Sequence, residues 1–155
     1  MGLELTLCTA NGFMGSTFVG VARAALEHAV QYAKERIQGG LPIIRHQAVK
    51  LRLFDMFRKV EAARSLNRRA VAYNMVNNPF AGAPAGAFPA VQYAIASKVT
   101  STQTAFEVAS DALQVFGGNG LSREYPIEKL LRDARASLIE DGANDVLALH
   151  AADKF

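Results

Sequence analysis

The run Gln114-Val115-Phe116-Gly117-Gly118-Asn119-Gly120 holds the residue types that best suit ligand binding. Because glycine has no Cβ atom, three glycines in four positions let the backbone adopt positive φ and come close to a bound group. Gln114, at the end of a predicted helix, can both donate and accept hydrogen bonds. The same residues could instead form only the glycine-capped end of a helix. The run by itself therefore leaves open both a binding loop and a structural cap.

Histidine and cysteine, the usual ligands of structural metal ions, are sparse in the chain. Cys8 is the only cysteine, so an internal disulfide is impossible and a reducing compartment is favoured. His28, His46 and His150 are isolated from one another, so we expect no metal site. The net charge is only +3 over 155 residues, with acidic and basic residues intermixed, so we expect no nucleic-acid partner.

The composition is that of one soluble globular domain. Half of the residues are hydrophobic and a fifth are charged, which is enough apolar surface for a packed core. No apolar run approaches the roughly 20 residues that a membrane span needs, and the amino terminus lacks the pattern of a secretory signal. We therefore expect no membrane partner and a cytoplasmic location.

The first half of the chain has the periodicity of two long helices. Residues 16–38 carry apolar side chains at steps of three and four, and Gly39-Gly40 ends this helix. Pro42 suits the first turn of a second helix that reaches Asn77 or Asn78. At about 35 residues it would extend roughly 50 Å, which suggests a bundle. Residues 1–15 are predicted to be a linker or part of a preceding segment.

The second half continues as helices separated by glycine and proline. Residues 79–89 are rich in both and predict a loop; helices are predicted at 90–116, from Pro126 to 138, and at 144–153, with Asp141-Gly142 breaking the chain before the last. No strand-like alternation is found after residue 10. We therefore predict an all-α fold for residues 16–155, an antiparallel up-and-down four-helix bundle with a short extra C-terminal helix.

Residues 111–120 read DALQVFGGNG, and residues 124–135 read EYPIEKLLRDAR. Together, these two segments resemble the signature of the acyl-CoA dehydrogenases. The resemblance also includes Arg36, His46-Gln47-Ala48 and Lys98, and it covers nearly the whole chain from Gly20 onward. This combination of motifs is highly specific. The chain therefore resembles the carboxy-terminal helical domain of that family.

The resemblance implies a flavoprotein assembly. In the family this domain is a four-helix bundle at the core of a homotetramer, with each FAD at an interface and its adenine dinucleotide portion reaching into a neighbouring subunit. We therefore expect a homo-oligomer, a dimer or a tetramer, with FAD as cofactor. For the complete enzyme, an acyl-CoA substrate and an electron-transfer flavoprotein would be the partners, as expected in fatty acid metabolism.

Residue matching also implies cofactor contacts. Arg36 would pair with the FAD pyrophosphate, a contact that suits the forked guanidinium group. The ADP portion would be contacted by Gln114, Gly117 and Gly118. The loop Ala143-Asn144-Asp145 would lie near the flavin.

Two positions depart from the family pattern. Gly39 stands where the family commonly has a phenylalanine that lies against the flavin, and Asn11 replaces an arginine that often lines the acyl pocket. The sequence therefore does not indicate a particular acyl substrate.

The candidate catalytic base is Asp141. Many members carry a glutamate that removes the α-proton of the thioester, and an ungapped count from Arg132-Asp133-Ala134 puts that position at Asp141. Its side chain is one methylene shorter, and a misplacement of about 1 Å can cost on the order of a hundredfold in rate. Glu140 is the alternative, reached by a one-residue slip, and a structural role for Asp141 as a cap or chain breaker also stays open.

Three functions remain possible from the sequence. The first is FAD-dependent α,β-desaturation of an acyl-CoA. The second is a related flavoenzyme, such as a nitroalkane-oxidase-like protein with an aspartate base, or a flavin monooxygenase. The third is a helical bundle that serves only oligomerisation. Because the family has two further domains ahead of this bundle, we expect the isolated chain to be inactive.

Overall fold

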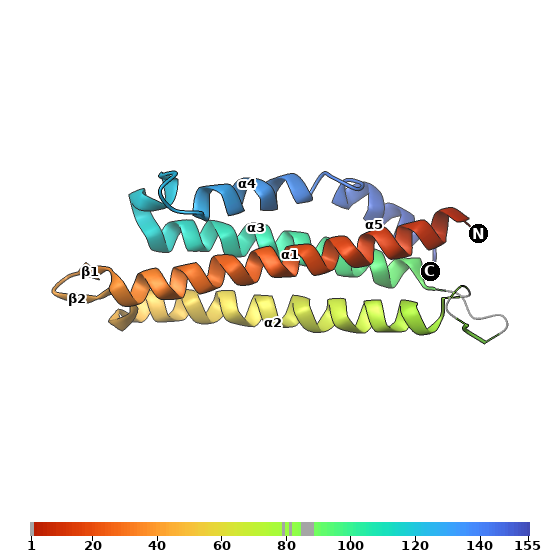
Figure 1. Cartoon of the computed structure of the whole chain (residues 1–155), viewed down its shortest axis with the longest axis horizontal. Coiled ribbons are helices and arrows are strands. Elements are labelled where there is room, and N and C mark those ends of the chain that lie inside the picture. The colour runs from red at the N-terminus through yellow and green to blue at the C-terminus, as the bar shows by residue number, and fades with distance from the viewer. Residues whose placement is uncertain (1, 79, 81, 85–88) are drawn as a thin grey trace.

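The chain folds into a bundle of helices. A computed structural model describes residues 2–78, 80, 82–84 and 89–155. Helices α1 (Gly2–Glu35), α2 (Gln47–Val76) and α3 (Val91–Phe116) run side by side in alternating directions (Figure 1). Two shorter helices, α4 (Ile127–Ser137) and α5 (Asn144–Ala152), follow one another in the fourth position of the bundle. The predicted all-α, up-and-down four-helix bundle with a short C-terminal helix is confirmed.

The amino-terminal boundary differs from the sequence prediction. Residues 2–15, predicted as a linker, are the first turns of α1. Cys8, Asn11 and Gly12 are buried there, so the segment packs on the bundle. The sequence did not indicate this part of the helix, because a polar residue and glycines occupy the buried face of residues 2–15. The last three helices, by contrast, begin and end within one or two residues of the prediction.

The connection from α1 to α2 also differs from the prediction. It is a hairpin of β1 (Ile37–Gln38) and β2 (Leu41–Pro42), followed by a 3₁₀ turn, so α2 begins at Gln47 and not at Pro42. Gly39 and Gly40 have φ of +63° and +80°, as a type I′ hairpin turn requires. Two-residue strands are too short to give an alternating pattern. Of the predicted loop 79–89, residues 79, 81 and 85–88 lie outside the described part of the chain.

The core is centred on α3, which packs against every other helix. Its closest partner is α1, and small side chains on both helices bring the two backbones together. Fully buried alanines lie at Ala22, Ala25, Ala29 and Ala33 in α1 and at Ala105, Ala109 and Ala112 in α3. Larger side chains of α2, led by Met56 and Val60, fill the space beside them.

α1 is long and apolar enough to cross a membrane if only length and composition are considered. In the bundle, its buried residues form one stripe against the other helices, and charged residues such as Arg23 and Glu27 occupy the solvent side. That distribution is the one expected for the core helix of a bundle.

A buried polar layer joins the three long helices. The Asn67 Nδ2 of α2 donates to Gly12 O at 3.2 Å and to Ser97 Oγ at 2.9 Å, and its Oδ1 accepts from Ser16 Oγ at 2.9 Å. Gly15 makes this layer possible, because a Cβ atom there would lie 2.5 Å from Asn67 Nδ2 and 2.8 Å from Ser97 Oγ. The absence of a side chain at Gly15 thus lets three helices share one amide.

Replacing Gly15 by alanine should destabilise the bundle, although alanine is the better helix former. The added Cβ atom would displace the Asn67 and Ser97 side chains, and we expect a loss of about 1–3 kcal/mol in the free energy of unfolding. Gly20→Ala is the matched control on the same helix, where the added Cβ atom meets nothing within 4 Å. It should add about 0.5–1 kcal/mol. Equal effects of the two changes in urea unfolding would contradict the packing argument.

Candidate functional site

A cavity of about 450 Å³ lies where the end of α1 meets the glycine-rich turn after α3. It brings Arg36 together with Gly117 and Gly118, three of the residues predicted to bind the cofactor. Gln114 is exposed one turn earlier and does not line the cavity. The lining residues are Tyr32, Arg36, Gln38, Ile43, Val115, Phe116, Gly117, Gly118 and Asn119.

An aromatic cluster fixes the glycine-rich turn against α1. The Tyr32 ring stacks on Phe116 with centroids 4.0 Å apart and planes 18° from parallel. Tyr125 meets both rings edge-on, at 5.9 Å from Tyr32 and 5.2 Å from Phe116. The amide of Asn119 donates to the Tyr32 hydroxyl oxygen at 2.9 Å. Since Arg36 is one helical turn after Tyr32, these contacts set the position of its backbone relative to the glycines.

The glycines present open backbone to the cavity. Gly117 has φ of +60°, and a Cβ atom on Gly117 or Gly118 would meet nothing within 4 Å. Gly120 is different, because a Cβ atom there would lie 3.0 Å from Leu113 O, so this glycine permits close packing. Arg36 is exposed and makes no ion pair with any residue that the structure describes. A free guanidinium beside uncovered backbone fits an anionic group such as the pyrophosphate of FAD.

The second cluster is the turn between α4 and α5, which carries both candidate bases. Glu140 and Asp141 are exposed, and Asp141 has φ of +53°. Gly142 follows with φ of +100°, and a Cβ atom on it would lie 3.0 Å from the Leu147 side chain. Aspartate tolerates the left-handed region better than most residues, so the Asp-Gly pair suits this turn.

Lys98 of α3 ties that turn to the bundle. The side chain is fully buried, and its Nζ donates to Gly142 O and to Asn144 Oδ1, both at 2.8 Å. Burial lowers the pKa of the Lys98 ammonium, and the negative charges of Asp141 and then Glu140 oppose that effect.

The remaining residues of the predicted flavin loop lie beside Lys98. The Asn144 side chain is directed at α3, where its Nδ2 donates to Thr102 Oγ1 at 3.0 Å. Ala143 is the half-buried cap residue of α5, and the Asp145 carboxylate accepts from the Val146 N–H at 2.9 Å. Their contacts with a cofactor stay a prediction, since the structure describes protein only.

The two clusters are far apart along α3. Lys98 precedes Gly117 by 19 residues, which is about 28 Å of helix. The predicted site residues thus form two groups, with Arg36 and the glycines at one end of the bundle and the Asp141 turn about halfway along it.

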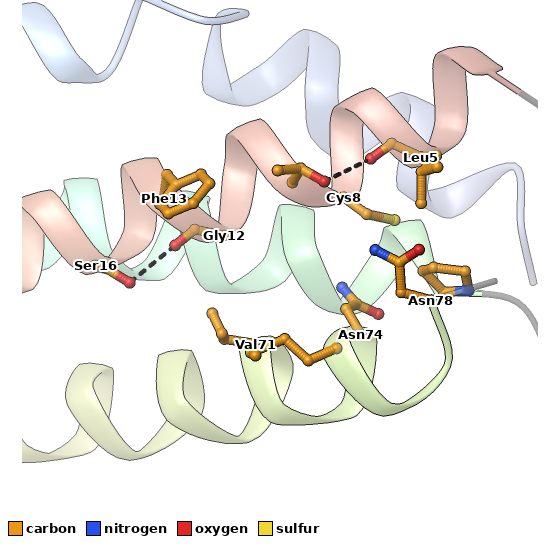
Figure 2. Close-up of a pocket in the computed structure, with 11 residues that line it drawn as sticks. Leu5, Cys8, Gly12, Phe13, Ser16, Val71, Asn74 and Asn78 are labelled. Atoms are coloured by element: carbon orange, nitrogen blue, oxygen red, sulfur yellow. Dashed lines mark hydrogen bonds between the residues drawn. The ribbon is translucent and has the colours of Figure 1, made fainter. Parts of the chain in front are cut away.

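A different cavity, of about 340 Å³, lies between the first turns of α1 and the last turns of α2 (Figure 2). Its walls are mainly apolar, and its hydroxyl groups already have partners in the bundle: Thr9 donates to Leu5 O and Ser16 to Gly12 O, both at 3.0 Å, and Ser16 also contacts Asn67 Oδ1. None of the predicted site residues lines it. Asn11, the departure from the family arginine, is buried on α1 but does not line it either.

The sequence and the fold have clear relatives. The profile of the family "Acyl-CoA dehydrogenase, C-terminal domain" matches residues 12–155. A short-chain-specific acyl-CoA dehydrogenase of Megasphaera elsdenii is 36% identical over 148 residues, which cover 94% of this chain and 36% of that protein. This chain therefore belongs to the acyl-CoA dehydrogenase family and corresponds to its C-terminal domain, as the signature segments predicted.

Two solved structures show the same bundle. Butyryl-CoA dehydrogenase from Megasphaera elsdenii superimposes with a TM-score of 0.85 at 32% identity, over 97% of this chain and 37% of that one. A nitroalkane oxidase in complex with spermine also gives 0.85, at 26% identity, over 97% of this chain and 34% of that one. The chain thus spans about a third of the length of these relatives.

Two contributors to the clusters were not identified as functional from the sequence. Lys98 entered the prediction only as part of the family resemblance, and Tyr32 did not enter it. A signal for Lys98 was present in the helical spacing, since it lies three residues after Ile95 and four before Thr102, both of which are buried in α3. A lysine in such a line indicates a buried charge with partners from another element. The partners themselves cannot be read from the spacing.

Cys8 should be a poor nucleophile in the folded protein. Burial, aided by the charge of Glu4, raises the pKa of its thiol from 9.0 to about 11. Because the thiolate is the reactive form, alkylation by iodoacetamide at pH 8 should be roughly a hundredfold slower in native protein than in urea. As Cys8 is the only cysteine, mass spectrometry of the intact chain measures the rate directly. Equal rates in the two states would show that the thiol is accessible.

Proposed function

We propose that this chain is the part of an FAD-dependent acyl-CoA dehydrogenase that binds the cofactor and contributes the catalytic base. The observation that carries the proposal is the placement of Arg36 beside the open backbone of Gly117 and Gly118, in a chain of this family. The guanidinium would pair with the pyrophosphate, while the glycine backbone would approach the ADP portion.

The proposed reaction is α,β-desaturation of an acyl-CoA thioester. FAD, when bound, supplies the acceptor for the hydride that leaves the β-carbon. The Asp141 carboxylate would take the α-proton, and the Asp141-Gly142 turn would direct it toward the substrate. The buried ammonium group of Lys98 lies beside this turn, where it donates to Gly142 O at 2.8 Å. Glu140 is the alternative base on the same turn.

A homo-oligomer is part of this proposal. About 28 Å of α3 separates the Arg36 cluster from the Asp141 turn. The separation is consistent with one chain contacting two FAD molecules, the ADP portion of one and the flavin of another, as the family resemblance implies. We further propose an electron-transfer flavoprotein as the electron acceptor and the cytoplasm as the location.

A nitroalkane-oxidase-like activity is the second candidate. Two observations favour it: the similarity of the bundle to a nitroalkane oxidase and the aspartate at position 141. Such an enzyme would also remove a carbon-bound proton with the carboxylate, but oxygen would then receive the electrons. The choice of electron acceptor therefore separates the two candidates.

Arg36→Gln should weaken FAD binding. Loss of a charge-assisted hydrogen bond typically costs about 1.5–3 kcal/mol, which corresponds to roughly a 10- to 150-fold rise in the dissociation constant of FAD. The control is Arg23→Gln on the same helix, because Arg23 forms a solvent-exposed pair with Glu27. Quenching of flavin fluorescence on titration of the apoprotein measures both. Unchanged FAD affinity in Arg36→Gln would reject the proposed pyrophosphate contact.

In the complete enzyme that contains this chain, Asp141→Asn should lower kcat by about two to four orders of magnitude, the usual contribution of a general base. Glu140→Gln is its matched control, and the rates are measured with an acyl-CoA and an artificial electron acceptor. A large loss in Glu140→Gln alone would assign the base to Glu140 instead. Wild-type turnover of a nitroalkane with oxygen but not of acyl-CoA would favour the oxidase. Undiminished activity in both variants would remove the base from this turn.

A further inference from the structure

Lys98 is a fully buried cation whose two hydrogen-bond acceptors both lie beyond α4. One acceptor is the Gly142 carbonyl, at the turn, and the other is the Asn144 side chain, at the start of α5. Thr102, one helical turn further along α3, holds the Asn144 amide from the other side. Lys98 and Thr102 of α3 thus form one polar unit with Gly142 and Asn144, which flank the base-carrying turn.

Burying an ammonium group is costly, so this lysine is not explained by packing. An apolar residue of similar volume would fill the same space without the desolvation cost. What the lysine adds is a pair of charge-assisted hydrogen bonds to a segment that has little apolar anchoring of its own. Within that segment, Glu140, Asp141 and Gly142 are all exposed.

We propose that Lys98 is a positioning residue for the proposed base, which it serves by clamping Gly142 O and Asn144 Oδ1 so that the Asp141 carboxylate is held in one place. The inference rests on the proposed function for its consequence in catalysis, but the clamp itself is a property of the folded chain. Two successive residues with positive φ leave the turn dependent on such a clamp, and an error of about 1 Å at the base can cost on the order of a hundredfold in rate.

The clamp also carries a positive charge. Among the described residues, the charged groups whose fields act on the ammonium are Asp141 and Glu140. The hydrogen-bonding side chains on α3 and α5, Thr102 and Asn144, are uncharged. The positive charge of Lys98 therefore lies close to the turn that carries both candidate bases.

The clamp can be tested independently of catalytic activity, by amide hydrogen exchange. In Lys98→Met, the Asn144 N–H, which donates to Leu138 O at 3.0 Å, and the Leu147 N–H, which donates to Ala143 O at 3.0 Å, should exchange at least about tenfold faster. Lys59→Met is the matched control, because Lys59 pairs with Asp55 and Glu107 on another side of the bundle. Unchanged exchange at both amides in Lys98→Met would overturn the proposal.

The catalytic consequence is tested by steady-state kinetics of the complete, FAD-loaded enzyme that contains this chain. Lys98→Met should lower kcat at least about tenfold with less than about a twofold change in KM for the acyl-CoA, whereas Lys98→Arg, which keeps a charged donor, should restore most of kcat. Wild-type kcat in Lys98→Met, or a loss in Lys98→Arg as large as that in Lys98→Met, would overturn the positioning role.

Asn144→Ala keeps the test decisive if Lys98→Met does not fold. It removes one acceptor of the clamp and leaves Gly142 O. The same two amides should therefore exchange faster than in the wild type, but by a smaller factor than in Lys98→Met. Wild-type exchange in this variant would overturn the clamp. Failure of the proposed function has a different signature: Asp141→Asn and Glu140→Gln would both remain active, while the exchange result in Lys98→Met would be unaffected.

Discussion

The close packing of α1 on α3 is the interaction around which the bundle is built and on which the Arg36 cluster depends. Fully buried alanines such as Ala29 and Ala109 let the two backbones approach each other. Their methyl groups are apolar and so need no hydrogen-bond partners in the interior. At the end of this interface, Tyr32 reaches Phe116 and Asn119. Larger side chains at the interface between α1 and α3 would separate the two helices and move Arg36 away from the glycine-rich turn.

α3 holds two turns by two different kinds of contact. At its C-terminal end, stacked aromatic rings hold a turn whose backbone is left open. Nearer its N-terminal end, the same helix holds the Asp141 turn with a buried ammonium group and a shared amide, not with apolar contacts. Apolar stacking holds the first turn while its Gly117 and Gly118 backbone stays uncovered. Charged hydrogen bonds at the second give a short, exposed turn a defined geometry.

The departures from the family pattern have local structural explanations in part. Gly39 replaces a common aromatic residue, and with φ of +63° it forms half of a two-glycine hairpin turn that a phenylalanine would strain. Asn11 replaces an arginine and is buried on α1, where its Nδ2 donates to Leu7 O at 2.8 Å. Neither Gly39 nor Asn11 lines the cavity beside the glycine-rich turn. Arg36, Gly117 and Gly118, which match the pattern, meet in that cavity.

The sequence by itself determined the family, the helical class and the ends of the last three helices, because glycine and proline mark those ends and a signature of consecutive residues is a local property. It did not determine that residues 2–15 extend α1, since their buried face carries Asn11 and Gly12 and looks polar or flexible in isolation. Nor could it pair Lys98 with Gly142, or stack Tyr32 on Phe116. Those contacts join residues 44 and 84 positions apart, and their geometry comes from how the helices cross. A periodic pattern states which face of a helix is buried, but only tertiary packing decides what lies opposite it.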